Sequence, residues 1–256
     1  MKRSRLPFYT ILAALVFFYL PIAVLVANSF NASRYGRTWT GFSLKWYAQL
    51  ARETVILRAL ANSLLIAVGA AVAATVLGTA AALALHRWSS RLQRAHYALI
   101  YTPLVVPEVL MGMSLLLLFV ALGVSLSLWT IFLAHVTFCV SYVALVVLAR
   151  LQDLDFTVIE AAHDLGATRW QAARLALLPM LWPGIVAGGL LAFTLSIDDF
   201  VITFFVAGAG STTLPIHIYS MIKHGSPPLI NALSTLLLAV TFILVWVSRS
   251  LMEKHE

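Results

Sequence analysis

Charged side chains are scarce in this sequence. Asp, Glu, Lys and Arg make up 11% of its 256 residues, whereas soluble domains carry roughly 25%. Apolar residues make up 61%, and the mean hydropathy is +0.93. This balance excludes a soluble globular domain and a disordered chain. The net charge of +7 does not indicate a nucleic-acid binder, because the basic residues stand in short runs beside long apolar segments, where membrane proteins carry them.

The sequence also lacks the residue patterns of several chemistries. Its single cysteine, Cys139, excludes a disulfide framework and a CxxC metal site, and we expect a buried, inert thiol. HExxH and GxSxG patterns are absent, and His135 is expected to be a hydrogen-bonded packing residue. No lysine follows a phosphate-binding glycine loop. We therefore expect no enzyme and no cofactor in this chain, so that ATP and Mg, if they drive it, bind a partner ATPase.

Long apolar runs are what the sequence has in abundance. A helix that crosses a bilayer needs roughly 20 mostly apolar residues. Six stretches qualify, at about 7–30, 59–85, 97–122, 124–149, 181–206 and 229–250. The first is too long for a signal peptide and is expected to be retained. The sequence therefore predicts an all-α, polytopic membrane protein with six transmembrane helices, in which residues 1–256 form a single transmembrane domain.

The distribution of basic residues predicts the orientation. An even number of spans places both termini on one side, and with the termini in the cytoplasm eleven of the 17 Lys and Arg residues face inward. The loop at 31–58, which carries five basic residues, goes against this bias. We expect a multi-pass protein of the cell inner membrane with both termini cytoplasmic.

The loop at 150–180 is the longest predicted on the cytoplasmic side. Thr157–Glu160 and Thr168–Gln171 both fit a capping box, in which the first and fourth side chains satisfy each other's backbone N–H groups. Gly166 tolerates the left-handed conformation that ends a helix. Pro179 is expected to end or bend the second helix. The pattern predicts a helix, a glycine turn and a second helix.

Three uses of such a loop can be compared. A DNA-binding helix-turn-helix is excluded, because Arg150 to Pro179 carries three basic and four acidic residues, a net charge of −1. A plain connector between spans and a docking element for a cytoplasmic partner remain. Glu160-Ala161-Ala162, followed by Gly166 and closed by Pro179, resembles the EAA loop of ABC importer permeases. The resemblance implies a type I ABC importer permease fold, in which Glu160, Ala161, Ala162 and Gly166 couple to a separate ATPase.

Acidic residues inside predicted spans need a reason, because each costs roughly 2.5–3.5 kcal/mol on insertion scales. Glu108 directly follows Pro107, and Pro103 stands four residues before that proline. Because neither proline has a backbone N–H, the helical hydrogen-bond pattern is broken here. Broken backbone at membrane depth is tolerated inside protein or beside a watery cavity. We therefore expect Glu108 to line a pathway, the alternative being a structural role.

Asp198 and Asp199 lie in the fifth predicted span and are followed by Phe200 and by Phe204-Phe205. Neighbouring helix positions point about 100° apart, so at most one carboxylate faces a narrow pore and the other pairs with a helix or outer water. Acids beside aromatic rings suggest a cationic substrate, held by charge and cation–π contacts. A structural pair near the outer surface is the alternative.

The segment Ala192–Phe200 resembles the corresponding segment of spermidine/putrescine permease subunits, as do Ser211–Pro215, Ile218–Met221, Asn28–Ser33 and Lys45–Tyr47. One departure is visible. The family carries a Glu shortly before Asn-Ala-Leu, whereas this chain has Pro228-Leu229-Ile230 before Asn231. The missing acid puts the particular polyamine in doubt and leaves room for another organic cation.

The resemblance implies three protein partners in addition to membrane lipid. They are an ATP-binding subunit dimer at the loop 150–180, a second homologous permease that forms a heterodimer, and a periplasmic substrate-binding protein on the outer loops at 31–58 and 207–228. An ATP-independent secondary transporter or channel is the alternative, but no inverted repeat is visible. A purely structural membrane anchor would leave the intramembrane acids unexplained.

Overall fold

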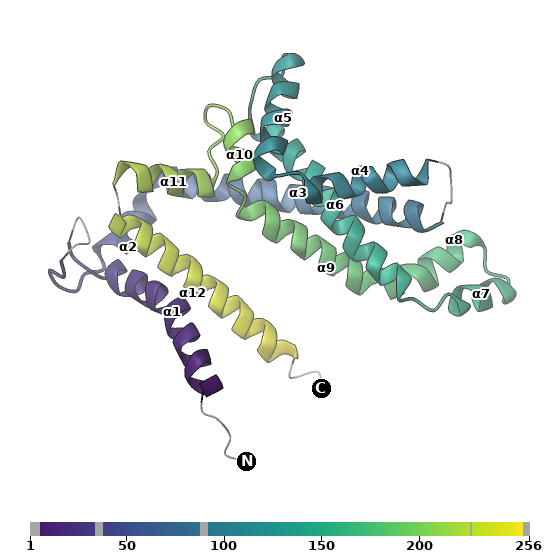
Figure 1. The fold of residues 1–256 in the computed structure, drawn as a ribbon, viewed down its shortest axis with the longest axis horizontal. Coiled ribbons are helices and arrows are strands. Elements are labelled where there is room, and N and C mark those ends of the chain that lie inside the picture. The colour runs from purple at the N-terminus through teal and green to yellow at the C-terminus, as the bar shows by residue number, and fades with distance from the viewer. Residues whose placement is uncertain (1–5, 34–37, 88–91, 226, 253–256) are drawn as a thin grey trace. The chain divides into compact units, whose positions relative to one another are not determined.

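The structure is a computed structural model that describes residues 6–33, 38–87, 92–225 and 227–252. Within these ranges the regular elements are all helical, and the only β interaction is an isolated bridge between Asn31 and Phe42. The all-α prediction is confirmed (Figure 1). The elements are α1 (Leu6–Ser29), α2 (Lys45–Arg52), α3 (Thr54–Arg87), α4 (Gln93–Val105), α5 (Glu108–Ala121), α6 (Leu128–Gln152), α7 (Thr157–Asp164), α8 (Arg169–Ala172), the π-helical η1 (Ala173–Leu177), α9 (Leu178–Ile197), α10 (Val201–Val206), α11 (Leu214–His224) and α12 (Pro227–Met252).

Residues 1–57 and 217–256 form one compact unit, and residues 58–216 form another. In the first unit α12 packs against α1 and α2. The segment between α1 and α2 is organised by the buried Asn31, whose side chain accepts from the N–H groups of Ser33 and Thr40 and donates to the Thr38 carbonyl. The most apolar 18-residue stretch within Phe8–Ser29 has none of its residues buried within the chain, and among the described side chains of α1 only Ser29, at its end, is buried. The surface of this apolar stretch is therefore available to lipid or to another subunit.

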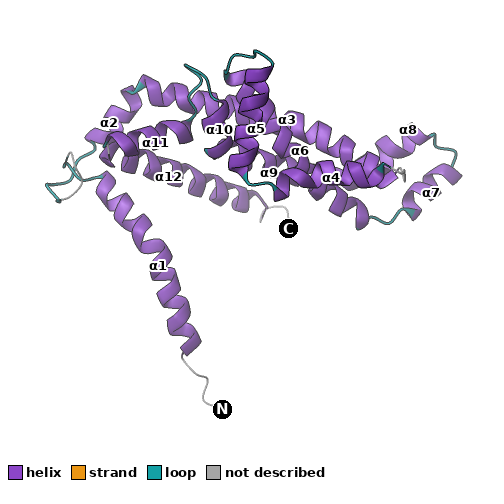
Figure 2. Ribbon diagram, turned by 45° about the horizontal axis from the view of Figure 1, so that its top comes forward, coloured by secondary structure: helices purple, strands orange, loops and turns teal. Residues whose placement is uncertain are grey.

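The second unit is built around α6, which packs most extensively against α9 and also contacts α4, α5 and α10. Figure 2 shows these helices gathered around α6. Close approach depends on small residues, as is common between membrane helices. A Cβ at Gly78 of α3 would lie 2.7 Å from the Cβ of Val143 on α6, and one at Gly188 of α9 would lie 3.2 Å from the Cγ1 of the same valine. Cys139 is fully buried in this core, as the sequence predicted.

Four helices among the described residues are long and apolar enough to cross a membrane: Phe8–Ser29, Thr54–Arg87, Leu128–Gln152 and Arg169–Ile197. The pair α4 and α5 is a fifth candidate, a broken span or a re-entrant loop. The described apolar part of α12, Pro228–Ile243, is shorter. A multi-pass protein is thereby supported, whereas the count of six spans stays a prediction.

Two predicted spans are interrupted. Within 97–122, α4 continues through Pro103, the break comes at Val106–Pro107, and the two helices meet at 111°. Within 181–206, α9 ends at Ile197 and the short α10 begins at Val201. The prediction that Asp198 and Asp199 lie on one continuous helix is therefore wrong, because these residues occupy the junction between α9 and α10.

Of the two outcomes expected at Pro179, an end or a bend of the second loop helix, the end is not observed. The second loop helix runs through η1 into α9, so Arg169–Ile197 is one continuous 29-residue helix. Pro179 lies at the start of α9, directly after the π-helical turn. Because a π turn already shifts the carbonyl pairing, the missing N–H of Pro179 is accommodated without ending the helix.

Candidate substrate cavity and coupling loop

The three predicted intramembrane acids line one cavity of about 310 Å³ in the second unit. The packing of α10 against α5 brings the start of α5, with Glu108, beside the α9–α10 junction, with Asp198 and Asp199. Both acid sites stand where helices are interrupted, at Val106–Pro107 and at Asp198–Phe200. The full lining is Pro103, Glu108, Met111, Phe138, Tyr142, Leu195, Asp198, Asp199, Phe200, Val201 and Ile202.

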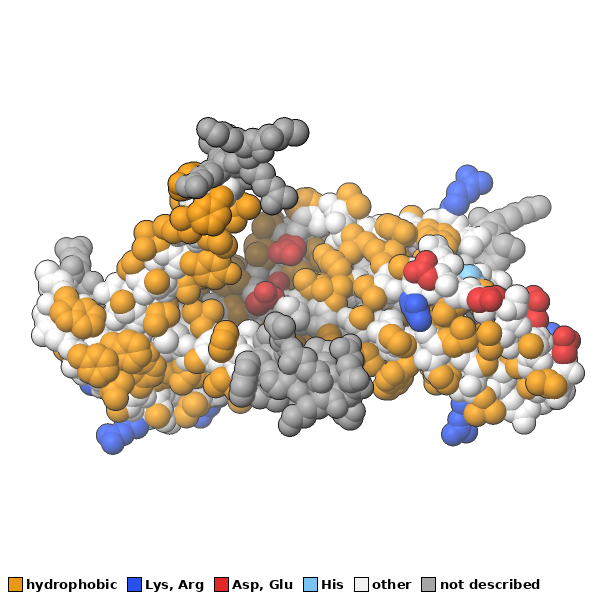
Figure 3. Space-filling view, turned by 90° about the horizontal axis from the view of Figure 1, so that it is seen from below, with side chains coloured by type: hydrophobic (Ala, Val, Ile, Leu, Met, Phe, Trp, Pro, Cys, Tyr) orange, Lys and Arg blue, Asp and Glu red, His pale blue; other side chains and the backbone are white. Residues whose placement is uncertain are grey.

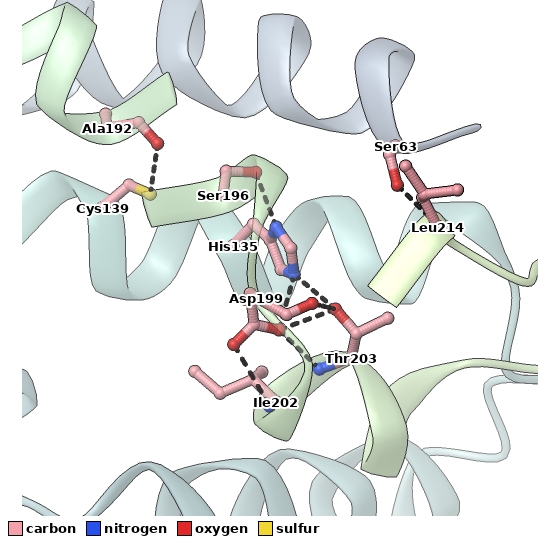
Figure 4. Close-up of polar contacts among 9 residues, drawn as sticks. All are labelled: Ser63, His135, Cys139, Ala192, Ser196, Asp199, Ile202, Thr203 and Leu214. Atoms are coloured by element: carbon pink, nitrogen blue, oxygen red, sulfur yellow. Dashed lines mark hydrogen bonds and ion pairs between the residues drawn. The ribbon is translucent and has the colours of Figure 1, made fainter. Parts of the chain in front are cut away.

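Asp199 is held by the N-terminus of α10. Its Oδ2 accepts from the Thr203 backbone N–H at 2.8 Å and from the Thr203 hydroxyl at 2.6 Å, and its Oδ1 accepts from the Ile202 N–H at 3.3 Å (Figure 4). The side chain is 6% exposed. N–H groups at a helix start have no intrahelical partners and attract negative charge, so this carboxylate acts as a cap. The pairing of one acid with a helix is therefore observed, and that acid is Asp199.

His135 connects α6 to this junction. Its Nδ1 lies 2.7 Å from the Ser196 hydroxyl, and its Nε2 lies 2.9 Å from the Thr203 hydroxyl and 3.2 Å from Asp199 Oδ2 (Figure 4). Since Asp199 accepts from Thr203, a proton on Nε2 completes the network, with Nδ1 accepting from Ser196. His135 is 1% exposed. It is a hydrogen-bonded packing residue, as the sequence predicted.

Asp198 and Glu108 differ from Asp199 in being exposed. In the described part of the chain neither carboxylate forms an ion pair or a hydrogen bond with another residue. Their carboxylates are therefore available to a positively charged ligand in the cavity, whereas Asp199 is occupied by its cap contacts. A single chain thus offers two accessible acids beside one acid fixed in the wall.

Aromatic side chains also line the cavity, although not all those expected. Phe200 does so, whereas Phe204 is largely exposed elsewhere and the Phe205 ring packs over Gly112. Phe138 and Tyr142 of α6 were not predicted. Their spacing of four residues places them on one helix face, but spacing alone does not tell what that face lines. Aromatic faces beside carboxylates form a suitable environment for an organic cation.

The loop that follows α6 folds as helix, glycine turn and helix, as predicted. Gly166 has φ +86°, the left-handed conformation that ends α7. Thr168 and Gln171 form the predicted capping box, with Thr168 Oγ1 accepting from the Gln171 N–H at 3.3 Å and Gln171 Oε1 accepting from the Thr168 N–H at 2.8 Å.

The first predicted capping box is wrong. Thr157 is already the first helical residue of α7, and its side chain forms no cap. Instead, the Asp155 carboxylate accepts from the Thr157 N–H at 3.0 Å. Hydrogen bonds from the backbone N–H and side chain of Thr157 hold the pKa of Asp155 below its ordinary value. A Thr157 cap would require α7 to begin at Val158, but α7 begins at Thr157 itself. The N–H group of Thr157 therefore needs an acceptor, and Asp155, two residues upstream, provides it.

The predicted coupling residues lie on an exposed surface. Glu160, Ala161 and Gly166 are exposed and Ala162 is half-buried. Several large apolar side chains of the same loop are also exposed, among them Leu165 at 89% and Trp170 at 73%. Orange hydrophobic side chains cover much of the surface in Figure 3, and acidic and basic side chains gather at the end formed by α7 and α8. The coupling role itself stays a prediction.

Among the described residues no group of three or more His, Cys, Asp or Glu side chains could hold a metal ion. The basic residues counted for the predicted orientation that lie outside the described residues are Lys2, Arg3, Arg5, Arg34, Arg37, Arg91 and Lys254. The geometry therefore defines two features, an acid-lined cavity at two helix breaks and an exposed helical loop joined to it by one continuous helix.

These features define a class of protein, the membrane-spanning permease. Comparisons with known proteins agree. The family described as "Binding-protein-dependent transport system inner membrane component" matches residues 74–254. The chain belongs to this family of ABC importer permeases, and multi-pass location in the inner membrane follows from that membership.

Two relatives and two solved structures illustrate the similarity. The chain is 45% identical over 262 residues to the putrescine transport system permease protein PotI of Escherichia coli, covering 99% of this chain and 93% of that protein. It is 40% identical over 240 residues to the spermidine/putrescine transport system permease protein PotC of Haemophilus influenzae, covering 94% and 93%. These relatives are transport permeases, not enzymes.

The fold is shared with solved importers. A bacterial ABC transporter that imports the acidic polysaccharide alginate superposes with a TM-score of 0.73 at 15% identity, covering 98% of both chains. The MetNI methionine ABC transporter superposes with a TM-score of 0.64 at 19% identity, covering 80% of this chain and 95% of that one. The type I permease fold is therefore confirmed, and its substrate is not addressed by these structures.

Proposed function

We propose that this chain forms the translocation pathway of an ATP-driven importer for a polyamine, putrescine or spermidine, or for a related organic cation. The observation that carries the proposal is the cavity in which Glu108, Asp198 and Asp199 meet. Polyamines are flexible polycations, and carboxylates beside aromatic faces suit them by charge and by cation–π contact. The names of the relatives in the preceding subsection support the same substrate class.

The assembly that we propose contains a second homologous permease, an ATPase dimer and a periplasmic substrate-binding protein. The exposure of Asp198 and Glu108 in the single chain supports a second permease, since charge at membrane depth is tolerated against protein or water but not against lipid. ATP and Mg are held by the ATPase dimer. Both termini lie in the cytoplasm, so that the loop 150–180 meets the ATPase and the outer loops at 31–58 and 207–228 meet the binding protein.

Alternating access is the mechanism that we propose. The ATPase dimer closes on ATP and moves the loops around Glu160 and Gly166. The continuous helix Arg169–Ile197 carries this movement to Asp198, which directly follows its last residue. A helix of 29 residues is about 43 Å long, enough to cross the hydrocarbon core. The cation released by the binding protein passes the accessible carboxylates as the cavity opens.

Recovery of the ATPase tests the coupling part. We would purify the tagged wild-type chain and a Glu160→Arg variant from native membranes. Glu53→Arg, which makes the same charge reversal outside the loop 150–180, is the control. Wild type and Glu53→Arg are expected to recover an ATPase, and Glu160→Arg to lose it. If no ATPase accompanies any of the three, the importer is refuted and ion-coupled uptake becomes the function to test.

Uptake of labelled putrescine and spermidine tests the substrate part. Asp198→Asn and Glu108→Gln each remove one accessible carboxylate and should each lower uptake at least tenfold, which corresponds to about 1.4 kcal/mol. Thr241→Val, on α12 and outside both the cavity and the loop 150–180, is the control and should transport normally. Normal uptake by both cavity variants, at equal expression, would refute the acidic pathway.

A further inference from the structure

A second cavity, of about 520 Å³, lies in unit 58–216 where two long apolar helices end. α3 contributes its last two residues, His86 and Arg87, and α6 contributes Leu151, one residue before its end. The opposite wall comes from α7, α8 and η1. Because the ends of spans lie at the level of the lipid headgroups, this cavity is placed at the membrane surface.

The charge of this cavity is of one sign. Arg87 and Arg169 line it together with His86 and His163, and no acidic side chain of the described residues does so. Over the ranges that the structure describes, neither arginine forms an ion pair or a side-chain hydrogen bond. An arginine guanidinium presents several N–H donors in the planar geometry that matches a phosphate. The cavity is therefore complementary to a phosphate group.

The two histidines are held in place by contacts within the chain. The His86 ring stacks on Phe156, with centroids 5.0 Å apart and planes at 13°. His163 Nδ1 lies 3.0 Å from the Ala167 carbonyl oxygen. Since a carbonyl only accepts, Nδ1 carries the proton in this contact, and Nε2 is left as the second polar atom of the ring. The basic wall is thus formed by anchored rings and by two arginines without partners among the described residues.

The remaining lining is apolar. Leu83, Leu151, Phe156, Ile159, Ala172, Ala173 and Leu177 provide it. A cavity with cationic groups at one part of its wall and aliphatic surface at the rest matches an amphipathic molecule rather than a free anion. Basic pockets at the ends of membrane helices bind lipid headgroups in this way.

The orientation of α7 separates this cavity from the surface proposed for the ATPase. Ile159 and His163, four residues apart, share the helix face that lines the cavity. Glu160 and Ala161 are exposed and do not line it. A partner that contacts Glu160 therefore meets a different face of α7 from the one that closes the cavity.

From these observations we infer that the cavity between the ends of α3 and α6 and the loop helices α7 and α8 binds the phosphate headgroup of an anionic phospholipid. Arg87 and Arg169 contact the phosphate, and the aliphatic wall contacts the first part of the acyl chains. The lipid bridges the end of α3 to the loop, so that it stabilises the position of α7 and α8. This inference does not depend on which substrate the chain transports.

Lipid retention by the purified full chain is the test. Delipidated protein would be mixed with phosphatidylglycerol or phosphatidylcholine, and bound lipid counted by native mass spectrometry. We expect the wild type to retain about ten times more phosphatidylglycerol than phosphatidylcholine, which corresponds to a difference of about 1.4 kcal/mol in binding free energy. The double variant Arg87→Gln with Arg169→Gln should lose this preference. Arg94→Gln with Arg174→Gln, which removes two exposed arginines that do not line the cavity, should keep it.

Three results would overturn the inference. The first is equal retention of the two lipids by the wild type. The second is displacement of phosphatidylglycerol by millimolar inorganic phosphate, which would identify a free-anion site. The third is unchanged lipid preference in the cavity variant together with loss of the co-purified ATPase, which would assign the arginines to a protein contact. Thermal unfolding of both double variants checks folding, and Arg87→Lys with Arg169→Lys, which keeps the charges, should retain part of the preference.

Discussion

Asp198 and Asp199 are neighbours in sequence, yet replacing each with Ala should have different effects on stability. The Asp199 side chain is 6% exposed and caps α10 through Thr203 and Ile202. Loss of a cap costs about 0.5–2 kcal/mol, and loss of the buried bond from the Thr203 hydroxyl adds about 1 kcal/mol. Asp199→Ala should therefore lower the free energy of unfolding by about 1.5–3 kcal/mol. Asp198→Ala, at an exposed position, should change it by about 0.5 kcal/mol or less.

Denaturant unfolding of the purified chain in lipid nanodiscs would measure both values. Asp199→Asn is the matched control, because an asparagine side-chain oxygen still accepts from helix N–H groups and caps about as well as aspartate. The decrease in the free energy of unfolding should be clearly smaller for Asp199→Asn than for Asp199→Ala. Equal destabilisation by Asp198→Ala and Asp199→Ala, or no loss with Asp199→Ala, would refute the assignment of Asp199 as the cap of α10.

Three further predictions concern packing and the loop. Gly78→Ala places a Cβ 2.7 Å from the Cβ of Val143 and should lower the free energy of unfolding by about 1–3 kcal/mol. Adding Val143→Ala to the same chain should recover part of this loss. If denaturant unfolding showed that the effects of the two substitutions simply add, the contact would be contradicted. Thr168→Ala removes a capping box and should raise amide hydrogen exchange at the start of α8, while Thr157→Ala, which removes no cap, should leave exchange in α7 nearly unchanged. Gly166→Pro cannot adopt φ +86° and should abolish ATPase recovery without preventing membrane insertion; unchanged recovery would remove the coupling role of this turn.

Features with a local cause could be predicted from the sequence. Long apolar runs predict membrane helices because each run must satisfy its own backbone within the bilayer. The turn at Gly166 and the capping box at Thr168 were predicted correctly, since both depend on residues within one helical turn. The box at Thr157 failed because a competing acceptor, Asp155, stands two residues upstream, and short-range rules do not rank the two.

The tertiary structure decided what the acids do. Asp198 and Asp199 look alike in sequence, and the helical period says only that they point apart. The end of α9, the start of α10 and the position of His135 on α6 make one of them a buried cap and leave the other in the cavity. Glu108 is 90 positions from Asp198, and they share a cavity because α10 packs on α5. By itself the sequence determined the membrane helices and the loop turn, whose energetics are local; the shared cavity required contacts between distant helices, which no local pattern encodes.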